Sequence, residues 1–166
     1  MKFKNIALAG VVGLSLTGCA TVMNGTNVDY LVDSDPTGAA VTFSGQTVGC
    51  VTPCERELRR ANHVRVDIVK DGFKPVYVLV ESKMGMATVG NVLAGGIVGV
   101  LVDSGNGSNR FLSPRPLVVR LARVGTADEA VLLNDDGEVV STVATHNDQA
   151  RAKVAEQLGA AATGIN

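Results

Sequence analysis

The sequence predicts a mainly β protein whose first part is a small β-sandwich. Short runs of alternating apolar and polar residues begin roughly every 8 to 12 residues, with turn residues between them, which is typical of a sandwich. Hydrophobic residues make up 46% of the 166 residues and charged residues 19%, so the chain can bury a core. A glycine-rich apolar segment, expected to be helical, follows these strands, and a hairpin and a helix end the chain.

Four strands are predicted before residue 59. Residues 28–33 alternate, which places Val28, Tyr30 and Val32 on one face. The DPTG motif at 35–38 predicts a turn, because proline presets φ at one corner and glycine accepts a positive φ at another. The next strands are expected at residues 40–43, 47–50 and 54–58.

Two further strands are predicted on either side of Asp71-Gly72, a pair typical of tight hairpin turns. They cover residues 63–70 and 73–81, and apolar residues alternate along both. The residues expected to face the core are Val64, Val66 and Ile68 on the first strand and Val76, Val78 and Val80 on the second.

These strands resemble the PEGA domain, a family named for a Pro-Glu-Gly-Ala signature. The motifs that carry the resemblance are SDPTGAAV at 34–41, Gly45, Gly49, TP at 52–53, Leu58 and VDIVKDGF at 66–73. The chain departs from the signature at Thr37, but the proline and glycine that form the turn are kept. The resemblance implies a non-catalytic β-sandwich module of exported bacterial proteins that mediates envelope binding or protein contacts. We therefore expect a PEGA-like β module at residues 28–82.

The N-terminus predicts an export signal and a lipid anchor. Residues 6–16 are an apolar stretch of 11 residues after a basic leader. Such a helix spans about 16 Å, against roughly 30 Å for a bilayer core. LTGC at 16–19 resembles the bacterial lipobox, which implies a diacylglyceryl group on Cys19, cleavage before it and acylation of the new amine. The alternative is an ordinary secreted protein with a chance cysteine.

We therefore expect a lipoprotein signal peptide at residues 1–18 and a tether at residues 19–27. In lipoproteins of this kind, an aspartate directly after the lipidated cysteine favours retention in the inner membrane. This chain has Ala20 at that position. The resemblance therefore implies anchoring in the outer membrane, facing the periplasm.

The cysteine count agrees with this location. If Cys19 carries lipid, Cys50 and Cys54 remain, and a disulfide is the expected fate of a nearby pair in an oxidising compartment. Such a bridge closes a tight turn and stabilises by roughly 2 kcal/mol on the chain-entropy model. The alternatives are two free thiols, or a zinc site completed by His63 or His146, although the spacing matches no common zinc module. We expect no metal and no cofactor other than the covalent lipid.

The segment TVGNVLAGGIVGVLV at 88–102 is the least ordinary part of the chain. Asn91, Gly95 and Gly99 recur every four residues, so a helix would carry them as a stripe of small residues. Fifteen helical residues span about 22 Å, short of a bilayer core. Three interpretations stay open: a segment packed on the β module, a segment in or on the membrane, or a self-association face. We assign residues 83–115 to this segment and the polar loop after it.

Residues 116–166 are predicted to form strands and a helix. A strand is expected at 116–123, and a hairpin at 129–143 around the DDG motif. A helix is expected at 147–159, with Asn147 as N-cap and Gly159 as C-cap. The residues expected to face the core are Leu117, Val119 and Leu121 on the strand and Ala150, Val154 and Leu158 on the helix.

Four arginines lie close together in the sequence, at Arg110, Arg115, Arg120 and Arg123. Guanidinium groups bind phosphate well, so one interpretation is contact with lipid phosphates or an anionic glycan. The other is the solvated face of a strand and its flanking loop. Both stay open from the sequence.

No catalytic constellation is recognised. The chain has two histidines, His63 and His146, and neither a Gly-x-Ser-x-Gly nor a His-Glu-x-x-His motif. The formal net charge of −1 argues against a nucleic-acid binder. We expect a lipid-anchored envelope protein, not an enzyme, that binds or organises another envelope component, either a protein or cell-wall glycan. The alternatives are a self-assembling membrane component acting through residues 88–102, and an enzyme with His63 as its base.

Overall fold

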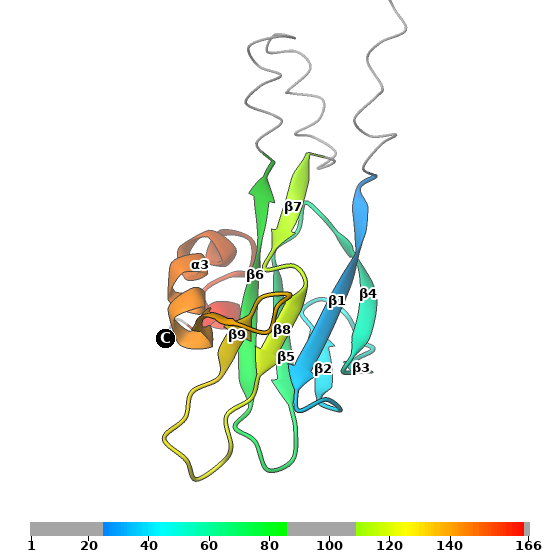
Figure 1. Cartoon of the computed structure of the whole chain (residues 1–166). Helices are drawn as coiled ribbons and strands as arrows, with labels where there is room; N and C mark the ends of the chain where they lie inside the picture. The colour runs from blue at the N-terminus through cyan, green and yellow to red at the C-terminus, as the bar shows by residue number, and fades with distance from the viewer. Residues whose placement is uncertain (1–24, 86–108, 165–166) are drawn as a thin grey trace, which may run out of the picture.

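The computed structural model describes residues 25–85 and 109–164, which form a two-sheet β body with one α-helix (Figure 1). One five-stranded sheet has the order β10-β9-β8-β1-β4, and the other has the order β3-β2-β5-β6-β7. The mainly β prediction is confirmed. The elements are β1 (Asn27–Asp35), β2 (Ala40–Phe43), β3 (Cys50–Val51), β4 (Cys54–Arg59), β5 (Val64–Val69), β6 (Val76–Met84), β7 (Arg110–Ser113), β8 (Leu117–Arg120), β9 (Val131–Leu133), β10 (Val139–Thr142), α3 (Val143–Leu158) and the 3-10 helix η2 (Ala161–Thr163).

The main core draws on both sheets. Because side chains alternate along a strand, every second residue of β1 turns inward, and Tyr30 and Val32 are fully buried. Strands β5 and β8 follow the same alternation, as predicted. The buried Tyr30 hydroxyl donates to Pro114 O at 2.7 Å, which gives its polar end a partner. Burial of one valine or leucine side chain in this core contributes about 1.5–3 kcal/mol to the free energy of unfolding.

The predicted strand at 47–50 is wrong. Strand β3 contains only Cys50 and Val51, paired with β2. The carbonyls of Val48 and Gly49 instead accept hydrogen bonds from the Arg56 guanidinium, at 3.3 Å and 2.8 Å. These two residues are therefore held by a side chain and not by a strand ladder.

The strand expected to start directly after Gly72 begins later, at Val76. Gly72 does form a turn, with φ +81° and a hydrogen bond from Phe73 N to Lys70 O. The chain then pairs with a different segment: Phe73 forms a bridge with Arg123, and Lys74 N donates to Ala122 O. Antiparallel pairing with β5 resumes at Val76.

Strand β6 continues to Met84, past its predicted end, because β7 pairs with residues 81–84. Residues 110–113, which we expected in a loop, form β7. Strand β6 is also buried on both faces: Val78 and Val80 lie in the main core, and Leu79 packs under α3 in a second cluster. The predicted stripe Asn91, Gly95 and Gly99 lies outside the described residues.

The C-terminal helix starts four residues before the predicted position. Its N-cap is Thr142, whose hydroxyl accepts from Thr145 N, so the prediction of Asn147 as N-cap is wrong. Gly159 is the C-cap, as predicted. Ala150 and Val154 are buried against β6, and Leu158 is half-buried beside them. Before the helix, β9 and β10 pair antiparallel.

Helix α3 docks onto the part of β6 that lacks a neighbouring strand on the β7 side. Strand β7 pairs only with Glu81 to Met84. In the part of β6 that precedes Glu81, Leu79 N donates to Asn147 Oδ1 at 2.9 Å, and Asn147 Nδ2 donates to Tyr77 O at 2.8 Å. The Asn147 amide thus takes the place of a neighbouring strand. None of the helices in the described residues is long and apolar enough to cross a bilayer.

Candidate functional site

Three chain segments meet at one end of the two-sheet body. Strand β1 begins there, β6 ends there and β7 begins there (Figure 1). The backbone joins them: Arg60 N donates to Thr26 O at 2.9 Å, and Gly85 N donates to Asn109 O at 2.8 Å. Five basic residues come from the end of β4, from β6, from β7 and from the loop after β7. We call them the basic end: Arg59, Arg60, Lys83, Arg110 and Arg115.

Arg60 holds the two sheets together at this end. Its Nε donates to Asn27 O on β1 at 3.2 Å, and a terminal nitrogen donates to Arg110 O on β7 at 3.5 Å. Burial, together with the positive charge of Arg115, lowers the pKa of Arg60. Arg60 and Arg115 are therefore electrostatic neighbours, although 55 positions apart in the numbering.

Arg110 and Arg115 present their charges beside Arg60. The Arg110 guanidinium donates to Ser82 Oγ at 2.7 Å and to Ser82 O at 3.1 Å, and the Ser82 hydroxyl donates to Arg60 O. Arg115 is exposed between two prolines. Burial raises the pKa of Tyr30, and the Arg115 charge opposes that rise, which places Arg115 near the β1 side of the cluster.

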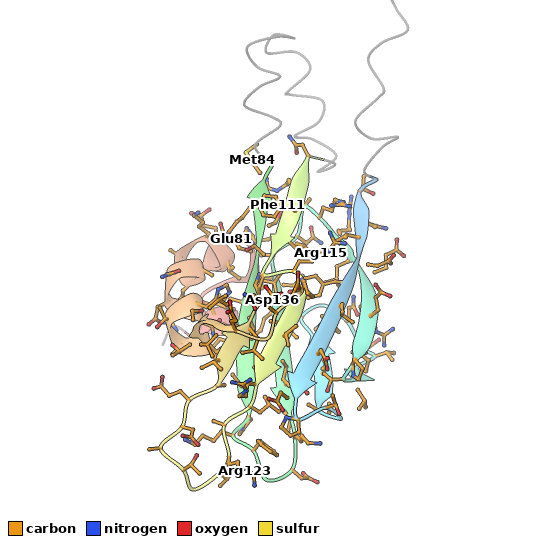
Figure 2. All side chains as sticks on the ribbon, viewed as in Figure 1. Glu81, Met84, Phe111, Arg115, Arg123 and Asp136 are labelled. Carbon is orange, nitrogen blue, oxygen red and sulfur yellow. A yellow bond between two sulfur atoms is a disulfide. The ribbon has the colours of Figure 1, made fainter. Side chains whose placement is uncertain are left out.

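The structure does not bring the four predicted arginines together. Arg110 and Arg115 lie at the basic end, whereas Arg120 pairs with Asp35 at 2.9 Å where β1 finishes. Arg123 lies at the opposite end of the body, 5.7 Å from the centre of the Phe73 ring (Figure 2). The sequence analysis did not single out Arg60. The signal that locates it is the β1–β4 register, which sets Arg59 opposite Asn27.

Two exposed apolar side chains flank the basic end. Met84 is 51% exposed and Phe111 is 41% exposed, and both belong to the last two residue pairs of the β6–β7 ladder (Figure 2). Residues that face each other on adjacent strands lie on the same side of the sheet. Phe111 faces Lys83 in this way, and Met84 faces Arg110. Each apolar residue therefore has a basic residue as its cross-strand neighbour.

Both histidine rings bond to the backbone of β6. His63 Nδ1 accepts from Ser82 N at 3.0 Å, and His146 Nε2 donates to Leu79 O at 2.8 Å. In residues 25–85 and 109–164, no group of three His, Cys, Asp or Glu side chains is arranged to hold a metal ion. The rings therefore serve as hydrogen-bonding partners of β6 in this arrangement.

The environment of His63 favours its neutral form. Burial, followed by the positive charge of Arg110 and that of Lys153, lowers the pKa of His63, while Glu81 and Glu156 oppose the shift. The hydrogen bond from Ser82 N also requires an unprotonated Nδ1. The protonated ring is therefore disfavoured in the folded protein.

We expect folding stability to fall as the pH drops below about 6.5, the usual His pKa. The unfolded chain takes up the proton first, so the loss begins there and ends at the lower pKa of His63 in the folded state. The slope is at most about 1.4 kcal/mol per pH unit and is reduced by solvent at this half-buried site. Urea titrations at about pH 8 and about pH 5 measure it. His63→Asn keeps an acceptor for Ser82 N and should lack this component; an unchanged pH dependence in that variant would contradict the assignment.

A cavity of about 360 Å³ lies between α3, the start of β6 and the loop at 122–130. Lys74 Nζ, at its edge, donates to Thr126 O and Asp128 O at 2.8 Å and 2.9 Å. Arg151, also in the lining, pairs with Asp148 at 3.0 Å. These lining cations are used by the chain itself, and the cavity does not overlap the basic end.

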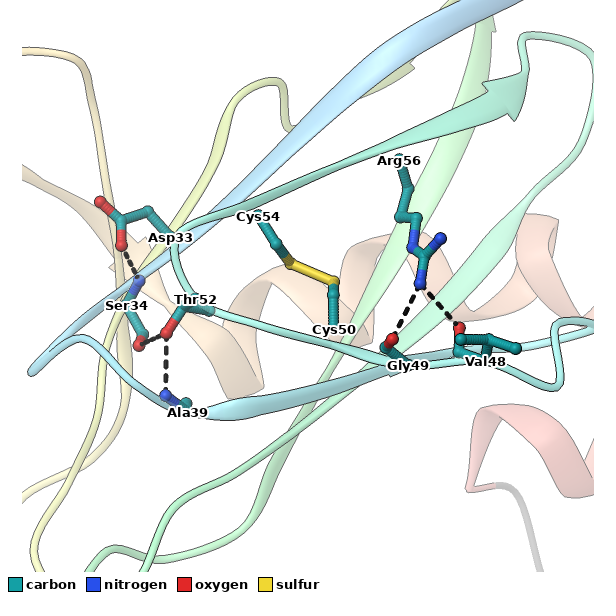
Figure 3. The surroundings of a disulfide bond; sticks show 9 residues. All are labelled: Asp33, Ser34, Ala39, Val48, Gly49, Cys50, Thr52, Cys54 and Arg56. Carbon is teal, nitrogen blue, oxygen red and sulfur yellow. Dashed lines mark hydrogen bonds between the residues drawn. A yellow bond between two sulfur atoms is a disulfide. The ribbon is translucent and has the colours of Figure 1, made fainter.

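The predicted disulfide is confirmed: Cys50 and Cys54 are bonded to each other (Figure 3). Cys50 belongs to β3, the edge of one sheet, and Cys54 to β4, the edge of the other. The bridge therefore joins the two sheets as well as closing a short turn, which the sequence alone did not indicate.

Residues 27–88 match the PEGA domain family. The PEGA match begins one residue before the predicted module, extends six residues beyond it and covers less than half of the chain. It includes β1 to β6 and the disulfide, whereas β7 to β10 and α3 lie outside it. Because β8 pairs with β1 and β7 pairs with β6, the C-terminal part completes both sheets of the PEGA region. No curated protein and no solved structure matches the chain.

Proposed function

We propose that the protein is a non-catalytic, lipid-anchored protein of the bacterial cell envelope that binds or organises another envelope component. The lipobox-like LTGC at 16–19 and the leader before it support the anchor. The PEGA match at 27–88 supports a binding module. The partner would be a protein or cell-wall glycan on the periplasmic side of the outer membrane.

The observation that carries the proposal is where β1 begins. Asn27 follows Cys19 by eight residues and lies at the basic end. Eight extended residues reach at most about 28 Å. A lipid on Cys19 would therefore hold the basic end next to the membrane and leave the opposite end, with Val69 and Val124 51% and 64% exposed, pointing toward a partner.

A second candidate, a self-assembling membrane component acting through residues 88–102, is favoured by one contact. Gly85 N donates to Asn109 O at 2.8 Å, so the chain between these residues leaves and returns at the basic end. With a lipid on Cys19, that segment would start and finish beside the membrane.

Two measurements test the proposal. Labelling with a fatty-acid analogue should mark the wild-type protein and leave Cys19→Ala unlabelled, and an unlabelled wild type would overturn the anchor. Pull-down from native envelopes after brief crosslinking should then recover a specific partner. Because Gly85 and Asn109 are bonded, residues 86–108 can be replaced by an Asn-Gly turn without opening the β6–β7 ladder.

The replacement variant separates the two candidates. A partner retained by it would place the function on the two-sheet body. A partner lost with it, while the urea midpoint stays unchanged, would favour assembly through the replaced segment. Recovery of no partner by the wild type would contradict the binding role.

A further inference from the structure

We infer that the basic end is a binding surface for anionic lipid headgroups, which orients the two-sheet body on the membrane. The inference rests on the proposed function only for the direction in which the body faces. Its evidence lies in the charges, the exposed apolar side chains and the arrangement of the described residues at this end.

The charges of the basic end are concentrated and come from segments far apart in the sequence. Arg59 ends β4 and Arg60 follows it, Lys83 lies on β6, Arg110 on β7 and Arg115 in the loop before β8. The 3.5 Å hydrogen bond from Arg60 to Arg110 O joins two of them, and the 2.7 Å hydrogen bond from the Tyr30 hydroxyl to Pro114 O holds the loop that carries Arg115 against β1. Such a concentration of positive charge creates a local field that attracts anions.

These cations are weakly compensated by acidic groups. In the described part of the chain, the four arginines of the basic end form no ion pair with a carboxylate, whereas Arg65, Arg120 and Arg151 each do. Two acids lie near the basic end: Glu57 accepts a hydrogen bond from Asn27 Nδ2, and Glu81 is shared between Lys83 of the basic end, at 3.8 Å, and Lys153, at 3.0 Å. The guanidinium groups hydrogen bond to carbonyls and a hydroxyl, which leaves their net charge uncancelled.

The exposed apolar side chains favour a bilayer over a soluble anion. Met84 and Phe111 stand on either side of the β6–β7 ladder among these cations. A basic surface with aromatic and aliphatic side chains is typical of proteins that lie on the lipid interface, where apolar groups enter the acyl boundary and cations contact phosphates. A binding site for free phosphate gains nothing from exposed apolar neighbours.

The position of the chain ends agrees with this occupant. Strand β1 begins at the basic end, so the predicted tether leaves the body there. A single acyl chain gives marginal membrane binding, and a basic patch is a recognised second contribution. Each basic residue near an anionic leaflet contributes about fivefold in affinity.

Co-sedimentation with vesicles tests the inference. The probe is the chain from residue 19 with Cys19→Ala, mixed with vesicles of phosphatidylcholine alone or with phosphatidylglycerol added. We expect binding to the anionic vesicles that weakens with salt, and little binding to phosphatidylcholine. Arg59→Gln with Arg115→Gln should lower the affinity for anionic vesicles about 25-fold, because two cations are lost.

The matched control removes the same charge at other positions. Arg120→Gln with Arg123→Gln changes the net charge equally, but Arg120 pairs with Asp35 and Arg123 lies at the opposite end. This pair should keep its affinity within about twofold. The urea midpoints of both double variants check that the substitutions leave the fold intact.

Three outcomes would overturn the inference. Equal losses in the two double variants would indicate a general charge effect. Equal binding to both kinds of vesicle would assign attachment to apolar contacts. Displacement by inorganic phosphate at matched ionic strength would assign the basic end to a soluble anion. None of these results depends on Cys19, so failure here is distinguishable from failure of the lipid-labelling experiment.

Discussion

Replacing Asn147 by leucine is expected to lower the free energy of unfolding by about 2–5 kcal/mol. Asn147 is 4% exposed, and its amide bonds to two backbone groups of β6, Leu79 N and Tyr77 O. Leucine has a similar volume but neither donates nor accepts. Both backbone groups would then lie buried without a partner, and each such group costs about 1–3 kcal/mol.

The effect should reach beyond the helix. Leu79 also packs against Ala150 and Val154, so a shift of α3 would expose the second apolar cluster. The expected signs are a lower urea midpoint and faster amide exchange at Tyr77 and Leu79.

Gln149→Leu is the matched control, since Gln149 lies on the same helix and is exposed. Its unfolding free energy should stay within about 0.5 kcal/mol of the wild type. If Asn147→Leu cost no more than this control, the account of Asn147 as a substitute for a neighbouring strand would be wrong.

Replacing Thr52 by valine is expected to cost about 2–4 kcal/mol, although the two side chains have nearly the same shape. Thr52 is 4% exposed, and its Oγ1 accepts from Ala39 N at 2.9 Å and lies 2.6 Å from Ser34 Oγ (Figure 3). The Ser34 hydroxyl donates to Pro36 O at 2.8 Å, so the Thr52 hydroxyl is the donor to Ser34. Valine would leave Ala39 N without this partner and interrupt the whole chain of bonds.

Urea unfolding measures this loss, and Thr42→Val is its control. Thr42 lies on β2 and is exposed, so the same change should shift stability by no more than about 0.5 kcal/mol. The Cys50–Cys54 bridge remains in both variants, because neither cysteine is altered. Equal midpoints for the two variants would show that the buried hydroxyl contributes nothing specific.

Much of the fold was predictable where one physical preference dominates. A strand with one buried face must alternate, and residues 28–33 and 64–68 do so without exception at their buried positions. The turn at 35–38 and the pairing of Cys50 with Cys54 followed from local chemistry in the same way. These predictions need no knowledge of distant partners.

The candidate site was only half predictable. Arg110 and Arg115 stood out because arginines are dense in that part of the sequence, but Arg120 and Arg123 shared this property and lie elsewhere. Arg60 could not be recognised, since its role depends on contacts with Asn27 on β1 and Arg110 on β7. Arginines that are close together along the chain are not necessarily close together in space.

The sequence by itself determined the strand faces, the main turns, the disulfide and the resemblance of the first part to a PEGA domain. Only the tertiary structure decided which groups contact β6: Asn147, predicted as a helix cap, instead bonds to the strand edge, and Leu79, between the core-facing Val78 and Val80, is covered by α3. Local pattern records the preference of a residue for one side or one conformation. Buried polar groups must be satisfied by whatever the fold brings near, and that partner can lie 68 residues away, as it does for Leu79 and Asn147.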